Sequence, residues 1–369
     1  MSKVAVVGSG SWGTALAILQ ARKGTHVKLW TRTHEEAKRL NDARENATFL
    51  KGFKFPRRLK ATSSLEEALG SADAVIIAVP AQSMRENAKR IREYITRPIP
   101  IVSATKGLEM DSCKRMSEVI EEEIKGSPCC GVCVISGPNI AQEAVQGPHS
   151  VAVVASQSSS LAEEVRLLLM TKCFCLYTST DVVGVELGGA LKNIVALGTG
   201  IADGLGHGAN GKAAFITRGL AEITGLGVAM RADPLTFSGL AGLGDMMATC
   251  FSPYSRNRFV GEELGKGRSL KDITASIPHI AEGITTSHVA QSMAQKMGVD
   301  MPVACVLNKV LYEGLQPQKA VNELIKPPVK QELAIIKESV PVLAHPARTG
   351  LRRWQLGLQS QPAMGVVPG

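Results

Sequence analysis

A single lysine stands inside a long apolar stretch of this sequence, DVVGVELGGALKNIVALGTGIAD at residues 181–203. Asp181 is a good N-cap, and the apolar residues after it recur at helical spacing, which predicts one long helix. Lys192 is the only charged residue between Glu186 and Asp203. A lysine held in such a helix loses hydration, so we expect its pKa to fall and its amine to become available for proton transfer. The alternative interpretation is that Lys192 extends its ammonium group out of a buried helix into water.

The same stretch contains glycines that are poor helix formers. A helix that tolerates them usually needs close approach of another backbone on that side. The residues concerned are Gly188, Gly189, Gly198 and Gly200. We therefore expect this helix to be packed tightly on several sides.

A glycine-rich loop near the N-terminus has the spacing G-x-G-x-x-G. It consists of Gly8, Ser9, Gly10, Ser11, Trp12 and Gly13. A β-branched strand precedes it, a helix follows it, and a second strand begins at His26, which is the context of a dinucleotide-binding turn. The free N–H groups and dipole of the helix N-terminus bind a pyrophosphate there, and the glycines let the phosphates approach. The alternative is a glycine-rich turn without a ligand.

The end of the second strand bears on which dinucleotide is bound. A site specific for NAD usually has Asp or Glu here for the ribose 2′-hydroxyl, but this sequence reads Trp30, Thr31 and Arg32. Arg32 could instead meet a 2′-phosphate, so NADP, or both NADP and NAD, fits better than NAD alone. The alternative is that Arg32 is a solvated loop charge.

Three further apolar strands are predicted at residues 74–79, 99–104 and 132–135, with helical segments between them. This alternation predicts an α/β domain whose parallel sheet is covered on both faces. Ligands bind at the carboxyl ends of such strands, where Pro80, Lys106 and Gly137 follow. Lys106 is therefore a second candidate lysine in the same crevice, unless it is an ordinary loop residue.

After Asp203 the sequence predicts helices separated by glycine loops. A glycine-rich segment at 237–244 leads to Asp245, and Ser255, Arg256 and Asn257 begin a further helix. The Arg256 guanidinium can donate two parallel hydrogen bonds, Asn257 adds an amide, and the start of a helix has free backbone N–H groups. Together these donors suit a phosphate. The alternative is a surface helix start with a solvated arginine. Glu282, at the start of a later helix, is either a cap or a ligand to a ribose.

The composition of the chain limits which classes of protein it can belong to. The chain has 369 residues, 44% hydrophobic and 20% charged, which is ordinary for a globular enzyme of two domains. The net charge of +9 is spread along a chain with few aromatic residues, so we expect no nucleic-acid platform but an anionic substrate and cofactor. No apolar run is long enough to predict a membrane span, and we expect a cytoplasmic protein.

The eight cysteines include a C-x-x-C at Cys130 and Cys133, but no second pair stands at zinc-ribbon spacing. The surrounding GVCVISG reads as a buried strand, in which cysteine acts as a small hydrophobic residue. We therefore expect no metal site. For domain organisation we expect a dinucleotide-binding domain at residues 1–180, a helical substrate domain at 181–332 and a loosely ordered tail at 333–369.

Several motifs occur together in one order, and their combination resembles a known family. They are GSGSWGTALA, the N-x-x-F-L of residues 46–50, SATKG, ISGPNIAQE, ELGGALKNIVALGTGIADGLG, GLAGLGD, SRNR and AEG. The chain resembles the NAD(P)-dependent glycerol-3-phosphate dehydrogenases of the bacterial soluble type, over about residues 3–332. The resemblance implies a Rossmann-like domain followed by an all-helical domain. It also implies a homodimer that interconverts sn-glycerol 3-phosphate and dihydroxyacetone phosphate and serves phospholipid synthesis.

The resemblance also implies roles for individual residues. The cofactor would contact Ser11, Trp12, Arg32, Phe49, Lys106, Ala141, Arg256 and Glu282 besides the glycines Gly8, Gly10 and Gly13. The substrate would contact Lys106, Gly137, Asp245, Ser255, Arg256 and Asn257, and also Asn139, although the family commonly has Ser at that position. Lys192 would be the proton acceptor, with Lys106 and Asp245 as its catalytic neighbours. A second departure is Lys51, where the family often has Pro.

Two competing functions fit parts of the sequence. A dehydrogenase of the same design acting on a β-hydroxy acid or a ketopantoate-like acid would also use a lysine on the interdomain helix, but it would have no need of the SRNR phosphate site. A dinucleotide-sensing protein without catalysis would keep Gly8–Gly13 but would not need Lys106, Lys192 and Asp245 together.

Overall fold

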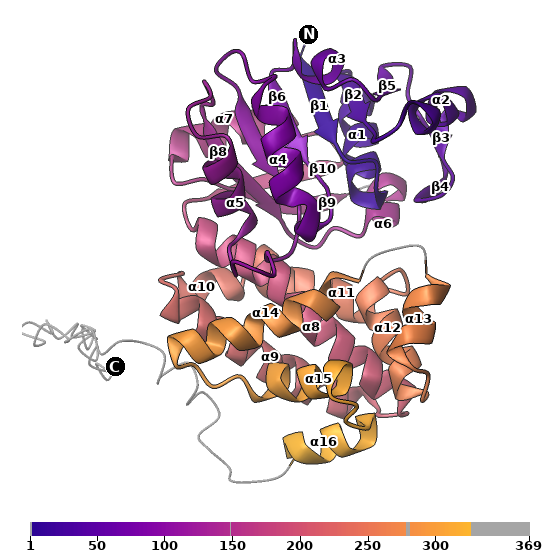
Figure 1. The fold of residues 1–369 in the computed structure, drawn as a ribbon, viewed down its shortest axis with the longest axis vertical. Coiled ribbons are helices and arrows are strands. Elements are labelled where there is room, and N and C mark those ends of the chain that lie inside the picture. Colours follow the sequence, from indigo (N-terminus) through magenta and orange to yellow (C-terminus); the bar gives the residue numbers. More distant parts are fainter. Residues whose placement is uncertain (1, 148, 278–280, 326–369) are drawn as a thin grey trace, which may run out of the picture.

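The computed structural model describes residues 2–147, 149–277 and 281–325 and consists of a sheet domain stacked on a helical domain (Figure 1). All strands lie between Lys3 and Ser179, and from Val182 onward the described elements are helices. In Figure 1 the parallel strands point toward the helical domain, so their carboxyl ends face the junction between the two domains. The tail predicted at 333–369 lies outside the described residues.

An eight-stranded sheet forms the first domain, in the order β10-β9-β8-β7-β6-β1-β2-β5. Its strands are β1 (Lys3–Val7), β2 (His26–Trp30), β5 (Leu59–Thr62), β6 (Ala74–Ile77), β7 (Pro100–Ser103), β8 (Gly131–Ser136), β9 (Ser150–Ala155) and β10 (Phe174–Ser179). A separate antiparallel pair consists of β3 (Glu45–Asn46) and β4 (Leu50–Lys54). The predicted doubly covered α/β sheet is thus confirmed.

The last two strands run against the rest of the sheet, which a purely parallel prediction missed. β9 pairs antiparallel with β8, with Ser136 opposite Val153, and β10 is parallel to β9. The connection from β8 to β9 contains only the six-residue helix α6 (Ala141–Gln146). Six residues of helix rise about 9 Å, less than half of the roughly 20 Å spanned by the six residues of β8, so this helix does not carry the chain back along the strand. The chain therefore turns and runs back beside β8.

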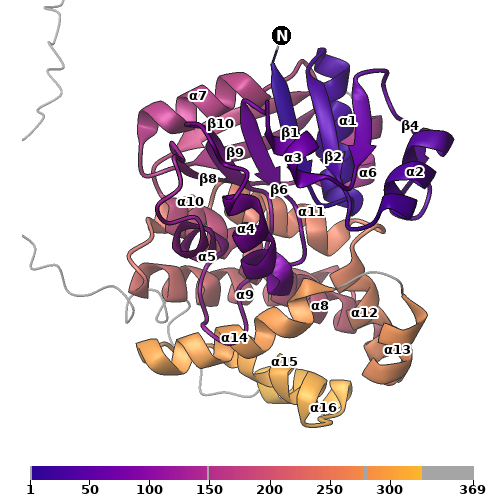
Figure 2. The same ribbon diagram turned by 45° about the horizontal axis from the view of Figure 1, so that its top comes forward.

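Helices cover both faces of the sheet. The other helices of this domain are α1 (Ser11–Lys23), α2 (His34–Ala43), α3 (Leu65–Leu69), α4 (Met84–Arg92), α5 (Met116–Glu123) and α7 (Ser159–Leu169), with a 3₁₀ turn at Ala81–Ser83. Apolar side chains of α1, α2, α6 and α7 pack on one face, and those of α3, α4 and α5 on the other. Figure 2 shows α4 and α5 on the near side of the sheet.

Two helix starts differ from the capping patterns that the sequence suggests. Ser160 and Glu163 have the spacing of a capping box, but Ser158 caps α7, because its side chain accepts a hydrogen bond from the Leu161 N–H. Thr33 and Glu36 also have the spacing of a capping box; Thr33 caps α2 by accepting from the Glu36 N–H, but the Glu36 carboxylate does not return to Thr33. It instead accepts a hydrogen bond from the Ser9 hydroxyl in the glycine-rich loop.

The long helix predicted around Lys192 is confirmed as α8 (Val182–Gly204), with the Asp181 side chain accepting from the Gly184 N–H. Its glycines lie where other segments come close. A Cβ on Gly188 would lie 2.7 Å from the Ala241 oxygen, and one on Gly189 would lie 2.3 Å from the Ser136 hydroxyl. Any side chain there would push α8 away from the sheet domain and from the loop before Asp245.

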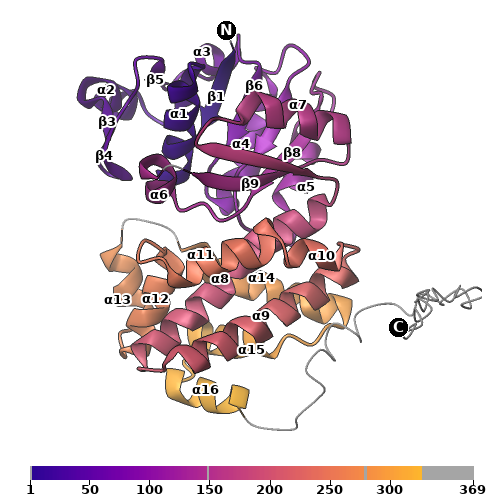
Figure 3. The same cartoon turned by 180° about the vertical axis from the view of Figure 1, so that it is seen from behind.

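Around α8 pack α9 (Ala209–Ala229), α10 (Pro234–Phe237), a π-helical turn (Leu240–Gly244), α11 (Asp245–Phe251), α12 (Arg256–Gly265), α14 (Glu282–Met297) and α15 (Pro302–Tyr312). Farther out, α13 (Leu270–Ser276) packs on α12, and α16 (Pro317–Ile325) packs on α15 and α12. Figure 3 shows α8 and α11 next to the sheet domain. By length and composition α8 is the one described helix that could cross a membrane, but 89% of its most apolar window is buried within the protein, as in a core helix.

A buried carboxyl group gives the helical domain a pH-dependent stability. Glu222 on α9 is 1% exposed and accepts hydrogen bonds from the N–H groups of Val303 and Ala304 at the start of α15. Burial raises the pKa of the Glu222 carboxyl to about 8. An unfolded chain loses this proton near a pKa of about 4.3, so between these values the folded protein binds more protons.

The free energy of unfolding should therefore fall as the pH rises through this window, and Glu222→Gln should remove about 3 kcal/mol of the fall between about pH 5.5 and about pH 8.5. Urea unfolding at several pH values measures this for the wild type, the variant and a control, Glu313→Gln, at an exposed position. Parallel stability curves for the wild type and Glu222→Gln would contradict the interpretation.

Candidate active site

The glycine-rich loop has the shape that a pyrophosphate needs. Gly8 has a φ of +111°, and a Cβ there would lie 2.5 Å from the Ala78 oxygen. A Cβ on Gly13 would lie 2.0 Å from the Gly8 oxygen, so α1 can begin this close to β1 only without a side chain. A Cβ on Gly10, at the N-cap of α1, would meet no atom within 4 Å, so this position opens onto free space. Free N–H groups with room in front of them fit a dinucleotide's phosphates.

The other candidate cofactor residues surround this loop. The Ser11 hydroxyl donates to the Phe49 carbonyl at 2.8 Å, which ties the segment before β4 to the loop. Trp12 packs edge-on against Phe174, with ring centroids 6.1 Å apart, and its indole N–H is buried without a partner among the described residues. Arg32 is exposed just after β2, while Ala141 begins α6.

Lys192 does not extend into water. It is 5% exposed, and its Nζ donates to Asp245 Oδ1 at 2.6 Å and also to the Thr249 hydroxyl. Asp245 is fully buried at the first turn of α11, and Thr249 lies four residues later on the same helix. The Thr249 hydroxyl in turn donates to the Asp245 backbone carbonyl at 2.7 Å. This hydrogen bond orients the lone pairs of the Thr249 oxygen toward the Lys192 ammonium.

Asp245 joins the two candidate lysines. Its second oxygen, Oδ2, accepts from Lys106 Nζ at 2.6 Å, and Lys106 also donates to the Gly137 carbonyl at 2.9 Å. Lys106 comes from the loop after β7 and Gly137 from the end of β8, whereas Lys192 and Asp245 belong to the helical domain. The cluster therefore spans the domain junction with two cations and one anion.

Burial lowers the pKa of Lys192 to about 8. Asp245 opposes this shift because its negative charge favours the ammonium, and Lys106 adds to it by like-charge repulsion. The outcome is an amine that changes its protonation state close to neutral pH, which is what proton transfer to or from a substrate requires.

Residues after β8 are held firmly by their neighbours. Gly137 has a φ of +152°, and a Cβ there would lie 2.8 Å from the Ala152 Cα. Asn139 donates its amide N–H to the Val151 carbonyl at 2.8 Å, which leaves its Oδ1 buried without a partner among the described residues. Asn139 thus offers an acceptor rather than the hydroxyl that a serine would supply.

The SRNR segment contributes a cap, a free cation and a buried amide. Ser255 caps α12 by accepting from the Arg258 N–H, while Arg256 is exposed at the first turn. Asn257 is 8% exposed, and its side chain donates to Asn193 and accepts from the Gly283 N–H, both at 2.9 Å. One N–H of Asn257 is then left for a ligand. Arg256 makes no hydrogen bond or ion pair with other residues in the described part of the chain.

The Glu282 side chain belongs to the helical domain and binds a backbone group of the sheet domain. It begins α14, and its carboxylate accepts from the Ala81 N–H at 3.1 Å, just after β6. A Cβ on Gly107, next to Lys106, would lie 3.3 Å from its other oxygen. Burial raises the pKa of the Glu282 carboxyl, and the nearby Arg256 charge opposes that shift.

The sequence analysis did not identify two residues that bind the candidate site residues, Thr249 and Asn193. Thr249 stands four residues after Asp245, a spacing that puts both on one helix face and that could have indicated it. Asn193 follows Lys192 directly, but its contact with Asn257 joins residues 64 positions apart, and no local pattern indicates it.

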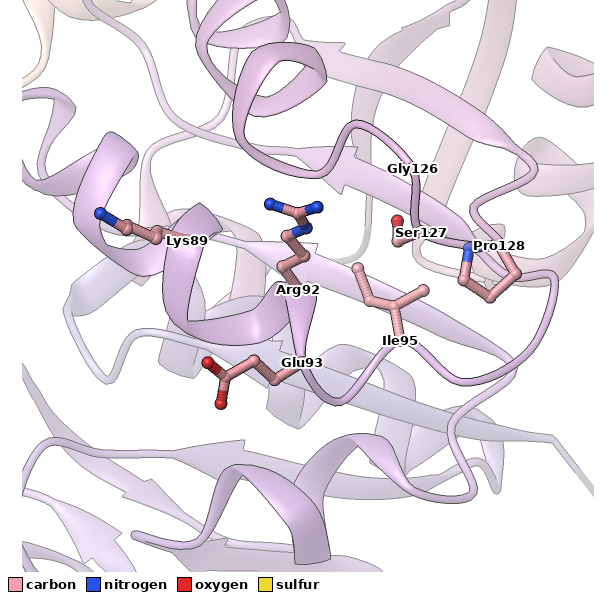
Figure 4. A pocket seen from close by; sticks show the side chains of 7 residues that line it. All are labelled: Lys89, Arg92, Glu93, Ile95, Gly126, Ser127 and Pro128. Atoms are coloured by element: carbon pink, nitrogen blue, oxygen red, sulfur yellow. The ribbon is translucent and has the colours of Figure 1, made fainter.

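Other features of the described residues lie away from this cluster. The pocket in Figure 4 has a volume of about 380 Å³ and lies between α4 and the loop before β8, with Arg92 and Ser127 facing it. None of the candidate residues lines it. The described residues include no group of three or more His, Cys, Asp or Glu side chains that could hold a metal ion. Cys133 is buried in β8, whereas Cys130 before it is exposed.

Comparison with known proteins agrees with the geometry. Residues 3–162 match the family model for the N-terminus of NAD-dependent glycerol-3-phosphate dehydrogenase, and residues 181–322 match the model for its C-terminus.

Similar proteins span nearly the whole chain. A glycerol-3-phosphate dehydrogenase [NAD(P)+] of Dehalococcoides mccartyi is 49% identical over 335 residues, which cover 90% of this chain and 93% of that protein. The enzyme of that name from Bacillus mycoides is 45% identical over 340 residues, covering 92% and 99%. The crystal structure of glycerol-3-phosphate dehydrogenase from Coxiella burnetii superposes with a TM-score of 0.84 at 36% identity, covering 88% and 99%. This chain therefore belongs to the NAD-dependent glycerol-3-phosphate dehydrogenase family.

Proposed function

We propose that this protein interconverts sn-glycerol 3-phosphate and dihydroxyacetone phosphate with NAD or NADP. The observation that carries the proposal is the junction cluster, in which Asp245 binds both Lys192 and Lys106 at the edge of the sheet that also holds the glycine-rich loop. The bound nicotinamide would take up or give back the hydride of the substrate's C2 carbon. The loop glycines, with Ser11, Arg32 and Glu282 around them, would hold that cofactor.

Lys192 is suited to handle the proton of the C2 hydroxyl. A neutral amine has two N–H groups, and Asp245 Oδ1 and the Thr249 hydroxyl are two acceptors for them. The lone pair is then free to accept the proton as glycerol 3-phosphate is oxidised. In the reverse direction the ammonium has a third N–H, which polarises the ketone and delivers its proton.

The remaining residues orient the substrate. Lys106 is held by Asp245 and by the Gly137 carbonyl, so its third N–H can point at a substrate oxygen. Arg256, exposed at the start of α12, would bind the phosphate as a charged fork, with the free N–H groups of that helix beside it. Asn257 would position Asn193 and the start of α14 and have one N–H left for the phosphate.

The resemblance to the family also bears on localisation, on oligomeric state and on the use of the product. We propose a cytoplasmic homodimer that supplies glycerol 3-phosphate for phospholipid synthesis, with the domains meeting at residues 180 and 181. The exposed apolar side chains of Met247 and Phe251, four residues apart on α11, support a subunit contact on the helical domain.

The direct test follows the absorbance of reduced nicotinamide. With dihydroxyacetone phosphate present, the protein should oxidise NADPH or NADH, whereas unphosphorylated dihydroxyacetone should be a poor substrate because it leaves Arg256 without a partner. Ketopantoate serves as the control for the rival type of dehydrogenase. Turnover of ketopantoate without turnover of dihydroxyacetone phosphate would refute the proposal, and nucleotide binding without either reaction would favour a sensor.

A further inference from the structure

The second strand ends without a carboxylate, but a carboxylate reaches the glycine-rich loop from the helix that follows this strand. The sequence has Thr31 and Arg32 where a carboxylate for the ribose 2′ position is usually found. Glu36, in the first turn of α2, nevertheless brings its carboxylate to the glycine-rich loop, where Oε1 accepts from the Ser9 hydroxyl at 2.6 Å. We propose that Glu36 is a specificity-determining residue that disfavours a 2′-phosphate and favours a free 2′-hydroxyl on the bound dinucleotide.

The position of this contact carries the argument. Ser9 lies between Gly8 and Gly10, and the Gly8 N–H donates to the Trp30 carbonyl at 3.2 Å, so the loop and the end of β2 lie side by side. A dinucleotide that places its pyrophosphate on the N-terminus of α1 has its adenosine ribose over this loop and its 2′ position toward the end of β2. The Glu36 carboxylate contacts Ser9 of this loop from the first turn of α2, the helix that follows β2.

Glu36 is also held in place. Ser9 is fixed through its carbonyl, which accepts from the Asn46 amide at 2.7 Å and from the Thr14 hydroxyl at 3.1 Å. Asn46 is fully buried and additionally donates to Thr14 at 2.8 Å. One Glu36 oxygen is thereby tied to a rigid loop, and the other is left for a ribose hydroxyl.

Glu36 and Arg32 would act in opposite senses. Arg32 is exposed and makes no hydrogen bond or ion pair within the described residues, so its charge is available to a 2′-phosphate. The half-buried Glu36 carboxylate would repel that phosphate and accept a hydrogen bond from a 2′-hydroxyl. The chain therefore has one residue for each dinucleotide, which suits a protein that binds both. The inference rests on the proposed nucleotide dependence and specifies which residue adjusts it.

Equilibrium binding of NADPH and NADH to Glu36→Gln tests the proposal. The amide keeps an acceptor for Ser9 and removes the charge, so affinity for NADPH should rise about tenfold relative to affinity for NADH. Adenosine 2′,5′-bisphosphate and 5′-AMP, titrated by calorimetry, should show the same change, because they carry only the adenosine half. Glu35→Gln is the matched control, since it removes an equal charge from the exposed neighbouring position on the same helix turn.

Binding is measured without turnover, so the result does not depend on the identity of the reduced substrate. A relative change below twofold in Glu36→Gln would overturn the proposal and leave Glu36 as a tether for the loop. Equal loss of affinity for both dinucleotides, or an equal change in Glu35→Gln, would overturn it as well. Failure of the dihydroxyacetone phosphate assay alone would refute the proposed reaction and leave this inference standing.

Discussion

Replacing Lys192 with methionine should lower turnover by about two to four orders of magnitude, the usual contribution of a general acid or base. Methionine keeps most of the volume of the lysine stem and removes the titrating group. Nucleotide binding should survive, because the glycine-rich loop belongs to the other domain and the Lys192 ammonium instead binds Asp245 and Thr249. Steady-state kinetics with dihydroxyacetone phosphate, together with equilibrium binding of NADPH, measures both effects.

The pH dependence of this reaction distinguishes proton transfer from a structural effect. Oxidation of glycerol 3-phosphate needs the neutral amine, so its rate should rise with pH through the Lys192 pKa of about 8. Reduction of dihydroxyacetone phosphate needs the ammonium, so its rate should fall through the same value. In Lys192→Met, both the rise in the oxidation rate and the fall in the reduction rate should be absent.

Stability must be followed in parallel, because among the described residues the substitution leaves the buried Asp245 with Lys106 as its one cationic partner. Removing one partner of a buried ion pair is destabilising. Lys271→Met, at an exposed position on α13, is the matched control and should behave as the wild type. If Lys192→Met folds, binds nucleotide and turns over within a few-fold of the wild type, the proton acceptor must be sought at Lys106.

Replacing Arg256 with alanine should weaken binding of glycerol 3-phosphate by about 2–4 kcal/mol, which corresponds to roughly 30- to 1000-fold in affinity. The change removes a charge-assisted fork from the start of α12, where the nearby Glu282 carboxylate acts on the Arg256 charge but forms no ion pair with it among the described residues. The Michaelis constant for the phosphorylated substrate measures the effect, and free glycerol should remain a poor substrate for both forms.

Arg258 offers a control two residues away on the same helix. Its guanidinium already binds Asp203 at 2.7 Å, so Arg258→Ala should affect stability without a comparable loss of substrate affinity. Equilibrium binding of NADH to Arg256→Ala separates a loss at the phosphate from a loss at the dinucleotide. An unchanged Michaelis constant in Arg256→Ala would place the phosphate elsewhere.

Local patterns in the sequence were sufficient for the framework of this protein. The glycine-rich loop, the alternation of strands and helices and the long helix α8 each follow from backbone sterics, side-chain periodicity and capping within a few residues. The glycines of α8 predicted close packing, and a Cβ on Gly188 would indeed lie 2.7 Å from the Ala241 oxygen. The same reasoning also identified Lys192 as a lone lysine in an apolar helix.

Only the tertiary structure decided how the chemical groups meet. Asp245 joins Lys106 and Lys192 across 139 and 53 positions of sequence, and the contact from Glu282 to Ala81 spans 201. Glu36 looked like a capping residue, yet its carboxylate turns to Ser9, 27 residues earlier. A side chain's local pattern defines which hydrogen bonds it can make, whereas the packing of distant elements determines which partner comes within reach and how much water is excluded. The depressed pKa of Lys192 depends on that packing, because burial is its largest cause.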